Sequence, residues 1–280
     1  METFLTELAN YLQYPFVRHA LVVGVLVALC TSLLGVSLVL RHYSFIGDGL
    51  AHVAFAASVV GGIVHLASPM MLTLPVTVLC TLALLMCQRT RERGDASLAV
   101  LSVTAMGGAY LALNVWGRAA NLSGDVCTAL FGSTSILTLT KAEVWMAVAL
   151  AAGVLAACLF FRHTIFAVTF DETFAETSGV PVRRFQALMA VLVAVVIVLA
   201  MQLVGALLVT ALLVLPALSA MRLCRTFQAV VAAAGAISVA CALAGMLLSI
   251  VYGTPVGATI VVADAGVLAV SSILGKLLRR

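Results

Sequence analysis

Long apolar stretches dominate this chain, and the short segments between them carry most of its charged residues. A helix needs about 20 mostly apolar residues to cross a lipid bilayer, and each stretch has roughly that length. The pattern therefore predicts an all-α integral membrane protein. We expect one domain over residues 1–280, a polytopic bundle of about eight to nine transmembrane helices. The expected spans are 20–40, 47–66, 71–88, 97–113, 142–161, 185–201, 203–221, 228–251 and 256–276.

The composition supports lipid as the solvent of this chain. Hydrophobic residues make up 64% of it and charged residues only 9%, whereas soluble domains carry about 25% charged residues. The seven cysteines are scattered without a C-x-x-C pair, so they are interpreted as small buried apolar side chains. The net charge of +4 comes from small basic clusters between apolar runs. That distribution is typical of membrane topology, and no nucleic-acid partner is expected.

The distribution of Lys and Arg predicts the orientation. If the first span ends in the cytoplasm, only Arg18, Arg118 and Lys141 of the 15 basic residues fall outside. The cytoplasmic ones are Arg41, Arg89, Arg91, Arg93, Arg162, Arg183, Arg184, Arg222, Arg225, Lys276, Arg279 and Arg280. The positive-inside rule then places the N-terminus outside and the C-terminus in the cytoplasm. This arrangement needs an odd number of spans and favours nine.

Three segments outside the spans have patterns of their own. Residues 1–16 are expected to form an amphipathic helix at the membrane interface. The outer connection 114–141 has an apolar middle, which suggests a re-entrant or interfacial piece. The inner connection 162–184 contains an acidic stretch, Asp171 to Ser178, that resembles a short exposed helix. Such a helix could dock another protein or could be a solvated loop helix without a partner.

Common enzyme motifs are missing from the sequence. It contains no G-x-x-x-x-G-K-[ST], no H-E-x-x-H and no G-x-S-x-G, which mark nucleotide, zinc-protease and hydrolase sites. The chain is therefore not expected to be an enzyme. If it performs work, the energy must come from a partner subunit or an ion gradient.

Asp48 and His52 are the main candidates for chemistry. They lie four residues apart at the start of an apolar run, so a helix presents both on one face. Carboxylate oxygen and imidazole nitrogen are suitable ligands for zinc, manganese or iron(II). A two-fold dimer would bring together the four ligands of a tetrahedral site. The alternative is structural: Asp48 caps a helix that begins near Gly49, and His52 bonds to a neighbour.

Asp264 is a secondary candidate inside the membrane. It lies near the middle of the last apolar run, where a carboxyl group needs a partner. It either has a functional role or forms a hydrogen bond to a Ser or Thr of a neighbouring helix.

Several segments together resemble one family, the permease (membrane) subunits of bacterial ABC transporters for zinc, manganese and iron uptake. The similar stretches occur in the family's order and cover the chain nearly end to end. They are RHYSFIGDGLAH (41–52), GDVCTALFGS (124–133), DETFAETSGVPVRR (171–184), VGALLVTALLVLPALSAMRL (204–223) and YGTPVGATIVV (252–262).

The resemblance implies a multi-pass permease of the bacterial plasma membrane that works as a homodimer or a paralogous heterodimer. It implies a cytoplasmic ABC ATPase dimer and an extracytoplasmic metal-binding protein as partners. Asp48 and His52 match the family's positions in the translocation pathway, and 171–180 matches its cytoplasmic coupling helix. The residues expected to contact the ATPase are Asp171, Glu172, Phe174, Ala175, Ser178 and Gly179. The metal ion is cargo, and no permanently bound cofactor is expected.

Two other functions remain open at the level of the sequence. An ion-gradient-coupled secondary transporter would use Asp48 or Asp264 as a proton-linked carboxylate. An ABC permease for a metal chelate, such as a siderophore or cobalamin, would need no ligand pair at its axis. Co-purification with a separate P-loop ATPase would exclude the secondary transporter.

Overall fold

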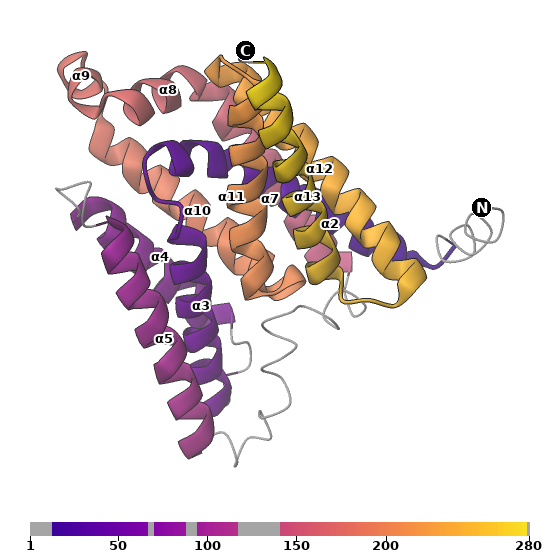
Figure 1. Cartoon of the computed structure of the whole chain (residues 1–280). Coiled ribbons are helices and arrows are strands. Elements are labelled where there is room, and N and C mark those ends of the chain that lie inside the picture. Colours follow the sequence, from indigo (N-terminus) through magenta and orange to yellow (C-terminus); the bar gives the residue numbers. More distant parts are fainter. Residues whose placement is uncertain (1–12, 67–69, 88–93, 117–140, 279–280) are drawn as a thin grey trace.

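The computed structural model describes residues 13–66, 70–87, 94–116 and 141–278, and within these ranges every regular element is a helix (Figure 1). The helices are α2 (Pro15–Leu40), α3 (Ile46–Ile63), α4 (Met70–Cys87), α5 (Gly94–Trp116), α7 (Lys141–Phe160), α8 (Arg162–Phe170), α9 (Glu172–Thr177), α10 (Val182–Val204), α11 (Ala206–Leu223), α12 (Phe227–Tyr252) and α13 (Val256–Leu278).

Each apolar run predicted from the sequence coincides with one of these helices, which confirms the all-helical membrane architecture. By length and apolar composition, six of the described helices can cross a bilayer: α2, α3, α5, α10, α12 and α13. A seventh span results if α7 and α8, which are bent by 70°, are counted together. The apolar parts of α4 and α11 are shorter, Met70–Leu84 and Leu208–Leu223.

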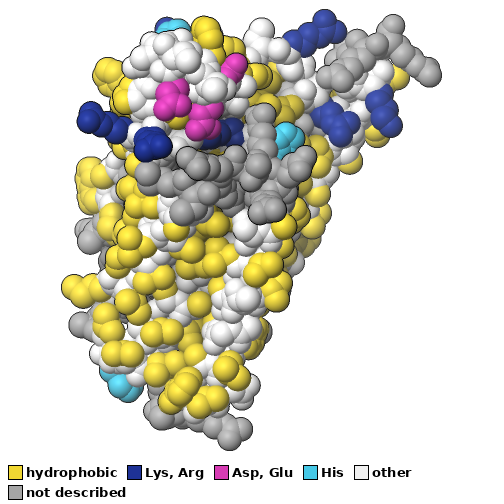
Figure 2. Space-filling view, turned by 90° about the vertical axis from the view of Figure 1, so that its left-hand side faces the viewer, with side chains coloured by type: hydrophobic (Ala, Val, Ile, Leu, Met, Phe, Trp, Pro, Cys, Tyr) yellow, Lys and Arg dark blue, Asp and Glu magenta, His cyan; other side chains and the backbone are white. Residues whose placement is uncertain are grey.

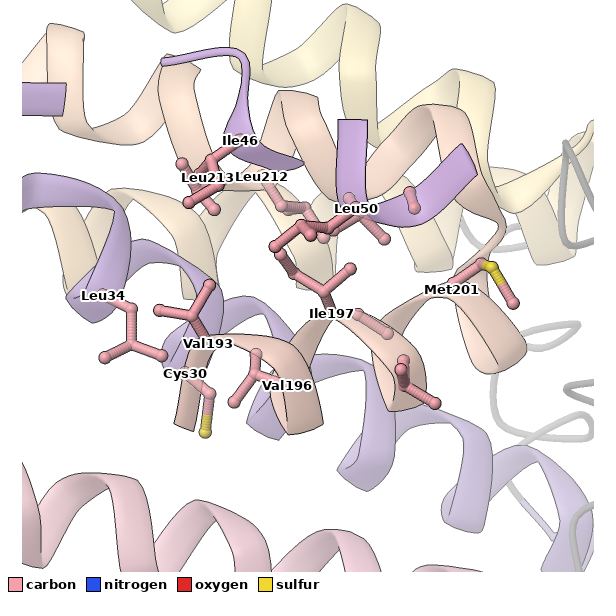
Figure 3. Packing of buried hydrophobic residues seen from close by; sticks show 14 of the residues in the cluster. Cys30, Leu34, Ile46, Leu50, Val193, Val196, Ile197, Met201, Leu212 and Leu213 are labelled. Atoms are coloured by element: carbon pink, nitrogen blue, oxygen red, sulfur yellow. The ribbon is translucent and has the colours of Figure 1, made fainter. Parts of the chain in front are cut away.

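Helix α2 passes through the middle of the bundle and packs against α7, α10, α11 and α12, while α3, α4 and α5 lie together at one side (Figure 1). Figure 3 shows part of the apolar core, to which Leu34, Ile197 and Leu213 contribute fully buried side chains from three helices. At Gly35 of α2, a Cβ atom would collide with the Leu213 carbonyl oxygen of α11. Small residues let membrane helices approach this closely.

The outer wall of the bundle is apolar. Large side chains such as Val103, Trp145 and Phe160 are 73%, 73% and 85% exposed, which a surface in contact with lipid tolerates and one in water does not. Figure 2 shows this hydrophobic wall, with acidic and basic side chains gathered at the end that carries α8 and α9.

Among the segments outside the predicted spans, the structure adds one helix, α8. Two of the other segments lie partly outside the described residues. Helix α8 was not predicted, because its nine residues are too few to stand out beside the long apolar runs. Phe166 and Phe170 of α8 contact Phe227 at the start of α12. Of the expected interfacial helix 1–16, residues 1–12 lie outside the described residues, and α2 already begins at Pro15. Of the expected outer segment 114–141, residues 117–140 lie outside them as well.

Candidate functional site

Asp48 and His52 lie one turn apart on the same face of α3, as the spacing predicted. The Asp48 Oδ2 and His52 Nδ1 atoms are 3.5 Å apart. The His52 side chain is 11% exposed and the Asp48 side chain 30% exposed. The pair is therefore embedded in the bundle, with the carboxylate still partly accessible from outside the chain.

Ser102 of α5 joins the two side chains and is the residue that the sequence analysis missed. Its hydroxyl donates to Asp48 Oδ2 over 2.6 Å, and its Oγ lies 2.8 Å from His52 Nδ1. A serine in an apolar run gives no signal in the sequence that sets it apart from the chain's other serines. Only the packing of α5 against α3 reveals its role.

Gly49 allows this packing. A Cβ atom at Gly49 would lie 3.3 Å from the Leu98 carbonyl oxygen of α5, a contact tighter than most, so a larger residue would require α5 to shift slightly. Leu98 precedes Ser102 by one helical turn, and Gly49 follows Asp48 directly. The close approach at Gly49 is therefore what brings the Ser102 hydroxyl within reach of Asp48.

The capping alternative for Asp48 is wrong. Helix α3 begins at Ile46, two residues before Asp48, and its N-cap is Phe45, which makes no side-chain cap hydrogen bond. A tight turn after α2 allows this early start: His42 has a φ of 62°, and the Tyr43 N–H donates to the Leu38 carbonyl. The other half of that alternative is confirmed, because His52 does bond to a neighbour, Ser102.

The described part of one chain does not contain a complete set of metal ligands. Among the residues that the structure describes, no group of three or more His, Cys, Asp or Glu side chains could hold a metal ion. Asp48 and His52 could supply two ligands, whereas zinc sites in proteins usually have four. A complete coordination shell needs ligands from water, from residues outside the described ranges or from a second molecule.

Asp264 lies on α13, which packs against α11 and α12, away from the contact between α3 and α5. Its side chain is 1% exposed, and within the described ranges neither carboxyl oxygen has a hydrogen-bond partner. The Cys241 thiol of α12 lies close enough to interact with this carboxyl group, but not in the geometry of a hydrogen bond. The hydrogen bond expected to a Ser or Thr of a neighbouring helix is therefore wrong.

The acidic segment after α8 forms the short helix α9, as predicted. Asp171 is its N-cap, and its carboxylate accepts from the Phe174 N–H over 2.9 Å, which lowers the pKa of that carboxyl group. Ser178 is the C-cap, and Gly179 follows with a φ of 85°, a conformation that favours glycine. The phenyl ring of Phe174 is exposed, and Ala175 is buried.

Glu172 ties α9 to the rest of the bundle through two contacts that the sequence did not predict. Its Oε2 lies 2.9 Å from Arg41 Nη2, and its Oε1 accepts from Gln186 Nε2 of α10 over 2.6 Å. Arg41 belongs to the turn between α2 and α3. A direct contact therefore connects α9 to the turn that precedes Asp48.

Comparison with known proteins agrees with this arrangement. The manganese transport system membrane protein MntC of Halalkalibacterium halodurans is 27% identical over 252 residues, which cover 89% of this chain and 84% of the relative. The high-affinity zinc uptake system membrane protein ZnuB of Haemophilus influenzae is 27% identical over 247 residues, or 88% and 92% of the two chains.

The same fold occurs in a solved structure, PsaBC from Streptococcus pneumoniae in complex with Fab, with a TM-score of 0.81 and 22% identity over 95% of both chains. A family model, that of the ABC 3 transport family, matches residues 13–275. Because this match spans nearly the whole chain, the protein belongs to the ABC 3 transport family.

Proposed function

We propose that this chain is the permease subunit of an ATP-driven importer of divalent transition-metal ions. The observation that carries the proposal is the Asp48–His52 pair, which lies inside an apolar helix of an ABC transport family member. Oxygen and nitrogen ligands of this kind suit zinc, manganese and iron(II). Relatives named for manganese and zinc transport agree with these ligands.

Family membership also favours this function over the two alternatives. An ABC permease is a transport subunit without ATPase activity of its own, so it differs from a secondary transporter driven by an ion gradient. The names of the relatives refer to manganese and zinc, not to a siderophore or cobalamin chelate. The chain is thus a multi-pass protein of the bacterial plasma membrane, as its apolar helices predicted.

A second permease protomer would complete the metal site. One chain supplies Asp48 and His52, and a two-fold axis beside α3 would double this set to four ligands. The partial exposure of the Asp48 carboxylate supports such an arrangement, because it leaves the oxygen accessible to an ion between two protomers. The second protomer can be an identical chain or a paralogue.

Nine spans with the N-terminus outside and the C-terminus in the cytoplasm remain the proposed topology. In support, three basic positions far apart in the sequence lie at the α9 end of the bundle. Arg41 pairs with Glu172 of α9, Arg162 begins the helix that leads to α9, and the Arg222 carbonyl lies against Gly275 near the end of α13. The positive-inside rule expects Lys and Arg to gather on the cytoplasmic side, and Figure 2 shows basic side chains near this end of the bundle.

We assign α9 as the coupling helix that contacts a cytoplasmic ATPase dimer. The exposed ring of Phe174, 65% accessible on a helix otherwise rich in acidic residues, suits an anchor in an apolar pocket of a partner. A pull on α9 would act on Arg41 through Glu172, and the turn at Arg41 leads into α3. Movement of the ATPase would thereby reach Asp48 and His52.

The resulting mechanism is alternating access. An extracytoplasmic metal-binding protein delivers the ion at the outer face, and Asp48 and His52 of both protomers hold it briefly. Motion of α9 then reorients the helices so that the ion leaves inward. Coordination has to stay weak enough for release, as at any conduction site.

The test is uptake of radioactive Mn²⁺ and Zn²⁺ by proteoliposomes that contain the full transporter and its binding protein. Asp48→Ala and His52→Ala are expected to abolish uptake at normal abundance in the membrane. His163→Ala is the matched control, because His163 is exposed on α8 and contacts Arg162. Uptake close to wild type in the Asp48→Ala and His52→Ala transporters would overturn the ligand role.

A further inference from the structure

We propose that Ser102 is a positioning residue that fixes the tautomer of His52, so that the Nε2 atom of this ring is free to bind the metal ion. This inference rests on the proposed function, since it concerns the same Asp48–His52 pair. It adds a residue from α5 that does not itself bind the ion.

The argument begins with the single proton of the Ser102 hydroxyl. The structure has the Ser102 hydroxyl as the donor to Asp48 Oδ2, and an ionised carboxylate can only accept hydrogen bonds. The Ser102 proton therefore points to Asp48 Oδ2, over the 2.6 Å contact. That length is normal for a hydroxyl that donates to a charged oxygen.

The Ser102 oxygen can then offer only a lone pair to His52. Since Ser102 Oγ lies 2.8 Å from His52 Nδ1, the Nδ1 atom must carry the hydrogen and donate. A neutral imidazole has one N–H, so Nε2 keeps its lone pair. The orientation of one hydroxyl thus selects the His52 tautomer in which Nε2 is the metal ligand.

The distances show why Asp48 cannot do this alone. Asp48 Oδ2 and His52 Nδ1 are 3.5 Å apart, beyond the 2.7–3.2 Å of an N–H···O hydrogen bond. The two contacts of Ser102 are both shorter. The serine therefore carries the interaction between the two proposed ligands, and the carboxylate acts on the imidazole through it.

Ser102 also uses its hydroxyl differently from its neighbour on the same helix. Thr104, two residues further along α5, donates to the carbonyls of Val100 and Leu101 in its own helix, which is common for hydroxyls in membrane helices. Ser102 donates across to α3 from a site that is 8% exposed. Without the Ser102 hydroxyl, His52 Nδ1 would be left with Asp48 Oδ2 at 3.5 Å, which is beyond the length of a hydrogen bond.

The test is nitrogen NMR of the full-length chain, labelled with ¹⁵N-histidine and held in lipid nanodiscs, with His52 assigned from a His52→Ala spectrum. The wild type is expected to show the Nδ1–H tautomer. Ser102→Ala should give a mixture of tautomers and weaken Zn²⁺ binding by about 10- to 100-fold, as loss of residues that orient metal ligands usually does. Ser102→Thr, which keeps a hydroxyl, should restore both.

A matched control is Ser271→Ala, because Ser271 is also buried, at 2% exposed against 8% for Ser102, and its recorded hydrogen bond goes to the Leu268 carbonyl of its own helix. It should leave the His52 tautomer and the Zn²⁺ affinity unchanged. An Nε2–H tautomer in the wild type would overturn the proposal even if Ser102→Ala did not fold. So would a Ser102→Ala spectrum identical to that of the wild type.

Failure of the proposed function would look different. In that case the wild-type His52 resonances would not respond to added Zn²⁺, while their tautomer would still change in Ser102→Ala. Ser102 would then position His52 in a site that does not take the metal.

Discussion

Two aspartates lie within apolar helices of this chain, and their surroundings are opposite. Asp48 on α3 accepts a hydrogen bond from Ser102, has His52 beside it and keeps 30% of its side chain exposed. Asp264 on α13 is 1% exposed, and neither oxygen has a hydrogen-bond partner among the described residues. A carboxylate that handles ions has to be accessible and has to be held in place, and only Asp48 meets both conditions.

The comparison also shows why depth in the membrane is a weak guide to function. Both aspartates are costly in an apolar helix, and that cost alone would make both functional candidates. The α3–α5 contact gives Asp48 a partner and an access route, whereas α11 and α12 enclose Asp264. The contacts around each carboxyl group therefore separate the two, although both lie within apolar runs of the sequence.

The largest expected effect on uptake comes from neutralising Asp48, and neutralising Asp264 serves as its comparison. Asp48→Asn keeps an oxygen that can accept from Ser102 but loses the anionic ligand. We expect it to reduce Mn²⁺ and Zn²⁺ uptake by at least about 100-fold, the upper end of the loss caused by residues that only support a metal ligand. Asp264→Asn should leave uptake close to wild type. Initial uptake rates in proteoliposomes measure both, and a large defect in Asp264→Asn would remove the distinction between the two aspartates.

The sequence predicted the Asp48–His52 pair well. The four-residue spacing of Asp48 and His52 places both on one face wherever this segment is helical, regardless of how the helix packs. The pair could therefore be inferred from local geometry. Ser102 could not, because its proximity depends on how α5 packs at Gly49. The missing partner of Asp264 could not be predicted either, since it depends on which side chains of α11 and α12 face α13.

The same distinction applies to the larger elements. The apolar runs predicted the helices because the length of a span is fixed by the bilayer. The Glu172–Arg41 contact joins residues 131 positions apart, and no local pattern encodes it. Helix α8 was missed for a related reason, because the aromatic contacts to α12 that accompany it are not local.

Glu172 extends the comparison to a third carboxylate, which is partnered like Asp48 but lies outside the membrane. Its ion pair with Arg41 involves side chains that are 50% and 17% exposed, so it should add only about 0–1 kcal/mol to folding stability. Glu172→Gln removes the charge and should reduce the coupling free energy by about 0.5–2 kcal/mol. The uptake rate should then fall roughly 2- to 30-fold. Zn²⁺ affinity should not change, because the Asp48–His52 pair is untouched.

Two further variants isolate the Glu172–Arg41 contact. The double variant Arg41→Glu with Glu172→Arg reverses the pair and should recover part of the uptake that each single variant loses. Glu176→Gln makes the same change in charge on the same helix, where the structure records no ion pair to that side chain. If Glu176→Gln reduces uptake as much as Glu172→Gln does, the total charge of α9 determines the effect, and the contact between Glu172 and Arg41 does not.

The smallest expected effect concerns thermal stability, which should rise for a substitution at Asp264 and not for one at Asp48. A buried polar group without a hydrogen bond costs about 1–3 kcal/mol, and Asp264 fits that description. Asp264→Ala removes this cost and leaves a small cavity, so we expect Tm to rise by roughly 2–4 °C for each kcal/mol gained. Asp48→Ala breaks the bond to Ser102 and should lower Tm or leave it unchanged. Thermal unfolding of both variants in the same detergent tests this, and a lower Tm for Asp264→Ala would mean that its carboxyl group stabilises the fold and is not a buried cost.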